Sequence, residues 1–176
     1  MKKLLLLSAF ILFSFSGSFA QSEGNSVKPP SGLSELEAYS IYYENYRADS
    51  YERAIEFGRW IWHGMPETLE GYPRFELKKN LDRLITSYSE VAKSKQDPSL
   101  KEAYVDTAFM IFEKAFEKFP DEKLDLYDWH IKRGRLFQTH SSYVENATAK
   151  AAEDYQKAFK INPKEFTNFG DGYYMK

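Results

Sequence analysis

Cysteine is absent from the 176 residues of this chain. Its absence excludes disulfide bonds, thiolate metal sites and thiol catalysis, so the fold must be stabilised by an apolar core. An excess of charge of either sign is lacking too, because 24 basic and 26 acidic residues leave a net charge of −2. A balance this even predicts no nucleic-acid partner.

Sequence motifs for catalysis are also lacking. The chain contains no G-x-S-x-G, H-E-x-x-H, C-x-x-C or phosphate-loop pattern. No two of the three histidines, His63, His130 and His140, have the i, i+4 spacing that would place them on one helix face to bind a metal ion. We therefore expect no enzyme activity, no catalytic residue, no cofactor and no metal site.

The longest apolar run lies at the N-terminus and is short. Lys2 and Lys3 precede apolar residues 4–15, and Ser18-Phe19-Ala20 resembles a signal-peptidase site. A bilayer span needs about 20 apolar residues, so we predict a cleaved signal peptide over residues 1–20 rather than a retained anchor. The mature chain would be exported to the bacterial periplasm or secreted. Residues 21–33, rich in Ser, Gly and Pro, are predicted to form a disordered leader.

Aromatic residues are abundant, with 13 Tyr and 14 Phe, and they supply large apolar surfaces for a core. Apolar residues from Val105 to Phe119 recur at steps of three and four, as on one face of a helix. No stretch shows the sustained alternation of a β-strand. The sequence therefore predicts an all-α fold with six helices, at residues 34–48, 51–64, 73–95, 99–118, 122–139 and 143–161.

Helix-capping patterns support several of these boundaries. Ser34-x-x-Glu37 and Ser142-x-x-Glu145 have the spacing of capping boxes. Asp97-Pro98 is typical of an N-cap followed by proline in the first helical turn. These patterns predict helix starts at the first, fourth and sixth elements.

The second helix of each predicted pair repeats one pattern. The matching segments are Ala54…Gly58…Ile61…Pro66, Ala108…Phe112…Ala115…Pro120 and Ala151…Tyr155…Ala158…Pro163. They resemble the A-x3-F…P half of the tetratricopeptide repeat, and the first helices carry a weaker match to its W-x2-L-G-x2-Y half. The resemblance implies three antiparallel hairpins, at about 34–66, 73–120 and 122–163, stacked as a right-handed α-solenoid. Residues 164–176 would be the start of a further unit or a truncated end.

Two departures from the family pattern are informative. The intervals between Pro66, Pro120 and Pro163 exceed the usual period of about 34 residues, which implies inserted loops. Tyr42 stands where the family usually has a small residue, and Gly58 stands where it usually has an aromatic one. Either the large and small residues have exchanged places across one contact, or the register of the first helix is shifted by one.

The resemblance implies that the first helices form a concave surface that binds a peptide or helix of another protein. Two registers of the first helix remain open. In one, the stripe Tyr39, Tyr43 and Arg47 is exposed on that surface. In the other, the stripe Tyr39, Tyr42 and Tyr46 is core, and the surface shows Ser40, Glu44 and Arg47. Extending the first register to the other hairpins adds Lys79, Asp82, Thr86, Arg135 and Gln138.

Trp60 and Trp62 flank Ile61 and point in nearly opposite directions on a helix. One is expected in the core, and the other either packs on the next hairpin or is an exposed contact residue. The function that these observations favour is an exported protein-protein interaction scaffold. The alternative is an accessory segment of a larger secreted enzyme, with a catalytic domain beyond residue 176. The sequence specifies neither the partner nor the oligomeric state.

Overall fold

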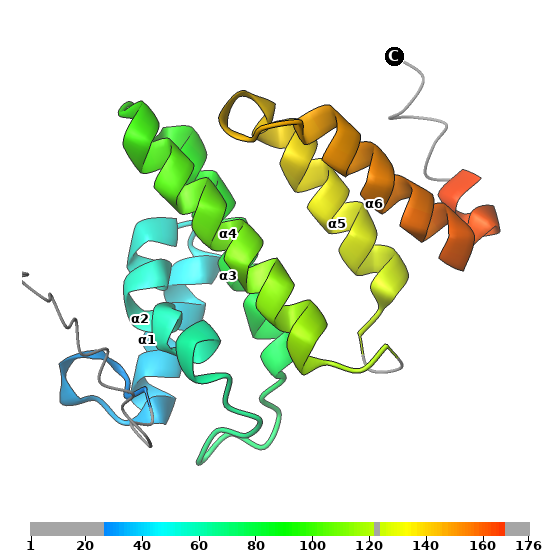
Figure 1. Cartoon of the computed structure of the whole chain (residues 1–176). Helices are drawn as coiled ribbons and strands as arrows, with labels where there is room; N and C mark the ends of the chain where they lie inside the picture. Colours follow the sequence, from blue (N-terminus) through cyan, green and yellow to red (C-terminus); the bar gives the residue numbers. More distant parts are fainter. Residues whose placement is uncertain (1–26, 122–123, 168–176) are drawn as a thin grey trace, which may run out of the picture.

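The computed structural model describes residues 27–121 and 124–167, and every regular element within those ranges is helical (Figure 1). The predicted all-α class is confirmed. The α-helices are α1 (Glu35–Arg47), α2 (Tyr51–Gly64), α3 (Leu77–Ser94), α4 (Pro98–Lys118), α5 (Leu126–Thr139) and α6 (Ala147–Ile161). Two 3-10 turns, η1 (Pro30–Gly32) and η2 (Ser141–Tyr143), accompany them.

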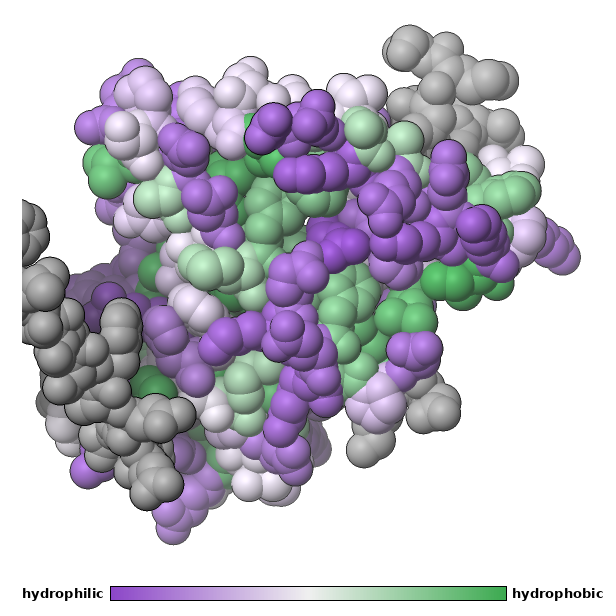
Figure 2. All heavy atoms as spheres, viewed as in Figure 1, coloured by the Kyte–Doolittle hydropathy of each residue, from purple (hydrophilic) through white to green (hydrophobic). Residues whose placement is uncertain are grey.

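Consecutive helices pack in pairs, α1 with α2, α3 with α4, and α5 with α6, and α2 also packs directly on α3. The seam between α4 and α5 is different, because large rings fill it. Phe109 stacks on Phe137 with ring centroids 4.3 Å apart, and Phe112 meets Trp129 edge to face at 5.4 Å. Hydrophobic side chains show between hydrophilic ones on this side of the molecule (Figure 2).

Local capping explains where the helices begin. Ser34 and Glu37 form the predicted capping box, and the Asp97 carboxylate accepts hydrogen bonds from the first backbone N–H groups of α4. The predicted starts of the last two helices at 122 and 143 are wrong. Asp125 caps α5, and Ser142 lies in the turn η2, so α6 begins only after Asn146.

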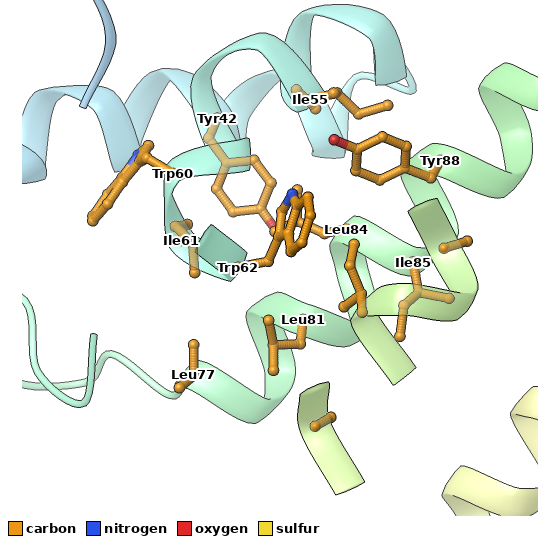
Figure 3. Close-up of a cluster of buried hydrophobic side chains, with 14 of the residues drawn as sticks. Tyr42, Ile55, Trp60, Ile61, Trp62, Leu77, Leu81, Leu84, Ile85 and Tyr88 are labelled. Carbon is orange, nitrogen blue, oxygen red and sulfur yellow. The ribbon is translucent and has the colours of Figure 1, made fainter. Parts of the chain in front are cut away.

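The main core extends from α1 to α5, and Figure 3 shows the part of it around α2 and α3. Trp60 and Trp62 project to opposite sides of α2, as expected, but both are buried, with exposed fractions of 3% and 6%. Trp62 points toward Leu84 on α3, whereas Trp60 points away from α3. Neither indole is therefore an exposed contact residue, because α2 is covered on two sides.

Tyr42 and Gly58 face each other across the first hairpin. Tyr42 is fully buried, and a Cβ placed on Gly58 would lie 2.8 Å from Cε2 of its ring. The third hairpin has the reverse arrangement, because a Cβ on Gly134 of α5 would lie 2.8 Å from Cζ of Tyr155 on α6. Each contact pairs a ring with a glycine, so the large and small residues have exchanged places in the first hairpin.

Residues 65–76 form a loop over α1 where the sequence predicted the third helix to begin at 73. Met65 ends α2 in the left-handed conformation, with φ of 48°, and turns the chain away from the helix. Leu69 and Phe75 are then buried in the main core. This burial explains why α3 begins only at Leu77, four residues later than predicted.

The chain segments that flank the hairpins also differ from prediction. Residues 27–33, predicted as part of a disordered leader, include η1, and Leu33 packs against the main core. Residues 163–167 are helical, and Asn162 caps this stretch through the backbone N–H of Glu165. The signal peptide predicted at residues 1–20 lies outside the described residues.

Candidate partner-binding surface

The side chains of α1, α3 and α5 border two hollows, and residues of α3 help to line both. The first, of about 200 Å³, lies between α1, the loop 65–76 and α3, and we call it the tyrosine hollow. It is lined by Tyr39, Tyr43, Tyr72, Arg74, Glu76, Lys79, Asn80 and Arg83. The second, of about 400 Å³, lies mainly between α3 and α5, and we call it the α3–α5 hollow. Its lining includes Asp82, Thr86, Ser89, Glu90, Lys132 and Arg135.

Aromatic rings and one guanidinium group build the tyrosine hollow. Tyr39 stacks parallel to Tyr43 with centroids 6.1 Å apart and meets Tyr72 at 5.1 Å. The guanidinium of Arg83 lies over the Tyr43 ring, 4.7 Å from its centroid. A cation in this position is attracted by the π-electrons of the ring. The wall between α1 and α3 is therefore a stack of flat groups with polar edges.

Ion pairs cross the α3–α5 hollow. The Lys132 ammonium of α5 contacts Asp82 of α3 at 2.9 Å and Asp128 of its own helix at 2.8 Å. Burial works to lower the pKa of Lys132, but these two carboxylates outweigh it and raise that pKa above its ordinary value. The pair connects the second and third hairpins across the hollow.

Six of the eight residues predicted for partner binding line these hollows: Tyr39, Tyr43, Lys79, Asp82, Thr86 and Arg135. Arg47 lies at the exposed end of α1, with its guanidinium 6.0 Å from the Tyr43 centroid. Gln138 does not join them, because its side-chain oxygen accepts a hydrogen bond of 2.7 Å from the Tyr155 hydroxyl of α6. Gln138 is exposed but lines neither hollow.

The exposure of Tyr39 that the first register predicted is wrong, whereas its burial agrees with the second register. Its side chain is only 5% exposed, because Tyr72 and Phe75 of the loop 65–76 cover it. Tyr42 faces Gly58, as the first register requires, and Tyr43 is half-buried at the hollow. The contact with Gly58 fits the first register. The burial of Tyr39 and Tyr42, the packing of Tyr46 against the main core and the exposure of Ser40, Glu44 and Arg47 fit the second. The sequence patterns did not identify Tyr72, Arg74 or Arg83 as part of this surface. Tyr72 and Arg74 reach the tyrosine hollow only because of the path of the loop 65–76.

Ser89 and His140 form a buried polar contact beside the α3–α5 hollow. Their Oγ and Nε2 atoms are 2.8 Å apart, a distance that would suit a nucleophile and its base. Within residues 27–121 and 124–167, no carboxylate contact to His140 accompanies it. The contact links α3 to the end of α5.

A second buried polar cluster joins α5 to α6. Asp154 is 1% exposed and accepts two hydrogen bonds of 2.8 Å from Arg133 and contacts His130 Nδ1 at 2.8 Å. Arg133 also pairs with Glu113 of α4. Burial works to raise the pKa of Asp154, but the hydrogen bonds from His130 and Arg133 outweigh it and lower that pKa. The cluster stabilises the third hairpin and attaches it to the second.

We expect the protein to lose stability as the pH falls below about 6.5, the ordinary pKa of an unfolded histidine. Burial, with Lys93 nearby, lowers the pKa of His140 in the folded chain. Between the two pKa values the unfolded chain binds a proton that folded His140 does not, so this stability is present above that range and lost as the pH falls through it. Urea midpoints at about pH 7.5 and about pH 5.5 measure the loss. It should shrink in His140→Gln, and an equal loss in both proteins would contradict the assignment.

Metal-binding and membrane-spanning features are missing from the part of the chain that the structure describes. No group of three or more His, Cys, Asp or Glu side chains there is placed to hold a metal ion. Among the same residues, no helix combines the length and apolar character that crossing a bilayer requires.

Comparisons with known proteins identify no relative from which a function could be transferred to this chain. No protein-family model, no curated protein and no solved structure matches the chain. By its fold and surface, the described part of the chain is an all-α protein of packed helical pairs, with hollows that residues of α3 help to line.

Proposed function

We propose that this protein is an exported interaction scaffold whose α1, α3 and α5 surface binds a peptide or helix of another protein. The arrangement would be a short solenoid of tetratricopeptide-like hairpins, in which the first helices form the binding face. The ring-to-glycine contacts at Tyr42 and Gly134 support this class, because they fall at corresponding positions of two hairpins. No nucleic acid and no cofactor is needed.

The observation that carries the proposal is the pair of hollows that residues of α3 help to line. Six of the predicted contact residues, from three separate helices, line these hollows. Tyrosine and arginine side chains at half-exposed positions are typical of binding surfaces, since they offer apolar area with polar tips at modest entropic cost. The hollows together would accept several consecutive side chains of an extended or helical peptide.

A pair of variants tests the surface. Tyr43→Ala should weaken partner capture by roughly 1–2 kcal/mol, as for a contact residue of an interface. Its loss of stability should be smaller, about 1 kcal/mol or less, because Tyr43 is only half-buried. The control is Arg53→Ala, which removes an exposed arginine of α2 that pairs with Glu56. Quantitative pull-down from the envelope fraction, with urea midpoints for both variants, gives the comparison. Equal capture by wild type and Tyr43→Ala would contradict the proposal.

Export is the second part of the proposal and has its own test. Expression in a bacterium with a functional secretion pathway should yield a mature chain beginning at Gln21, because residues 18–20 suit signal peptidase. Intact-mass spectrometry of the periplasmic or culture-medium protein measures this directly. A mature mass that still includes Met1 to Ala20 would rule out the predicted cleavage.

A further inference from the structure

The tyrosine hollow combines residues from three chain segments that are distant in sequence. Tyr39 and Tyr43 come from α1, and the first turns of α3 supply another part of the wall. The loop 65–76 supplies Tyr72, Arg74 and Glu76. Its lining is predominantly polar, although three tyrosine rings contribute to it. Polar groups around a hollow favour a polar occupant, because a buried polar group needs a partner.

The charge of this lining is unbalanced. Arg74, Lys79 and Arg83 are cationic, and Glu76 is the only carboxylate in the wall of this described hollow. Glu76 is already paired with Lys79 at 2.6 Å. Among the ion pairs of the described residues, none involves Arg74 or Arg83. Within the described part of the chain, two guanidinium groups therefore border the hollow without an ion-pair partner.

Arg83 is held in place by groups that do not neutralise it. Its Nη1 donates a 3.0 Å hydrogen bond to the side-chain oxygen of Asn80, and its plane lies over Tyr43. Asn80 is 1% exposed, and its amide nitrogen donates to the Glu76 carbonyl at 2.9 Å. A guanidinium fixed in this way loses little further freedom when it binds, and its planar fork matches two oxygens of one acid group.

The size of the hollow decides what kind of occupant fits. At about 200 Å³ it is smaller than the roughly 300–1,000 Å³ of typical small-molecule pockets. One acidic side chain fits this space better than a whole metabolite. The larger α3–α5 hollow, of about 400 Å³, would take other residues of the same peptide.

From this geometry we infer that the tyrosine hollow is a subsite for one aspartate or glutamate side chain of the peptide partner, bound by Arg83 and Arg74. The inference rests on the proposed function, because it assigns one residue of the ligand that the whole surface would bind. Tyr39 supplies a further donor. Burial is the main cause that raises the pKa of its hydroxyl, so the group stays protonated at neutral pH.

Selection of phage-displayed 12-residue random peptides on the folded mature protein tests the subsite. Peptides that bind the wild type should share an acidic residue at one fixed position. Replacing that residue by its amide should weaken binding roughly tenfold or more, as expected when a charge-assisted hydrogen bond is lost. The effect should decrease as the salt concentration rises, because the partly exposed charges are screened.

Variants of the two arginines complete the test. Arg83→Gln and Arg74→Gln should each reduce the preference for the acid over its amide, whereas the control Arg53→Gln on α2 should retain it. Arg74 is exposed in the loop, so its variant tests the subsite even where Arg83→Gln weakens the fold. The double variant Arg74→Glu/Arg83→Glu should select lysine or arginine at the same position.

The outcomes separate the subsite from the wider surface. Peptides that bind without a fixed acidic position, or that keep it in both arginine variants, would overturn the subsite and leave the proposed function standing. If no peptide binds the wild-type surface, the proposed function and the subsite both fail.

Discussion

Phe112→Ala should destabilise the protein by roughly 3–5 kcal/mol, the usual cost of truncating a buried aromatic residue. Phe112 is 1% exposed and lies on the inner face of α4. Its ring meets Trp129 of α5 edge to face at 5.4 Å and stacks near Phe116 at 6.4 Å. Truncation therefore opens a cavity where the second hairpin packs on the third. Urea denaturation followed by far-ultraviolet circular dichroism measures the loss.

Met110→Ala provides the matched control on the same helix. Met110 is 49% exposed, so its truncation should change the free energy of unfolding by no more than about 0.5 kcal/mol. A loss of similar size in both variants would mean that the inner face of α4 has been assigned wrongly. An unchanged midpoint for Phe112→Ala would lead to the same conclusion.

Tyr42→Ala should also cost roughly 3–5 kcal/mol, because it empties the center of the first hairpin. Tyr42 is fully buried, and its hydroxyl donates a 3.1 Å hydrogen bond to the Asn80 carbonyl of α3. The side chain thus fills the space above Gly58 and also connects α1 to α3. Tyr42→Phe retains the ring and should cost only about 1 kcal/mol, the net value of one hydrogen bond.

Gly58→Ala tests the contact between Gly58 and Tyr42, because that contact should reverse the sign of the substitution's effect on the free energy of unfolding. In an unobstructed helix this change stabilises by up to about 1 kcal/mol. Here the new Cβ would press on the Tyr42 ring, so we expect a loss of about 1–3 kcal/mol. Combined with Tyr42→Leu, which frees space, the loss should be smaller than the sum of the two single losses. Strict additivity would contradict direct contact between the two positions.

The sequence predicted the helices well because the information for them is local. The three-and-four spacing from Val105 to Phe119 describes the buried face of α4, and Asp97-Pro98 marks its first turn. The Ser34 capping box likewise fixes the start of α1. The failed starts at 122 and 143 are also instructive. In both cases a neighbouring feature determines where the helix starts. Asp125 caps α5, and the turn η2 precedes α6.

The binding surface was less predictable because it depends on contacts between distant segments. The sequence left open whether Tyr39 is exposed or in the core, and only the path of the loop 65–76 shows that Tyr72 and Phe75 cover it. The same loop brings Arg74 to Arg83 around one hollow. Gln138 follows the helical repeat of the surface residues, but the Tyr155 hydroxyl draws it toward α6. Helical periodicity predicts the direction in which a side chain points, whereas the residues that bury it depend on the tertiary fold.

Site-specific photo-crosslinking tests the binding surface most directly. A photoreactive phenylalanine analogue would replace Tyr43 at the tyrosine hollow or Thr86 at the α3–α5 hollow, and Glu56 of α2 or Met110 of α4 as exposed controls. After irradiation of cells that export the protein, positions 43 and 86 should yield the same crosslinked partner, and positions 56 and 110 should yield little of it. Partner crosslinks at 56 and 110 that equal or exceed those at 43 and 86 would contradict the account.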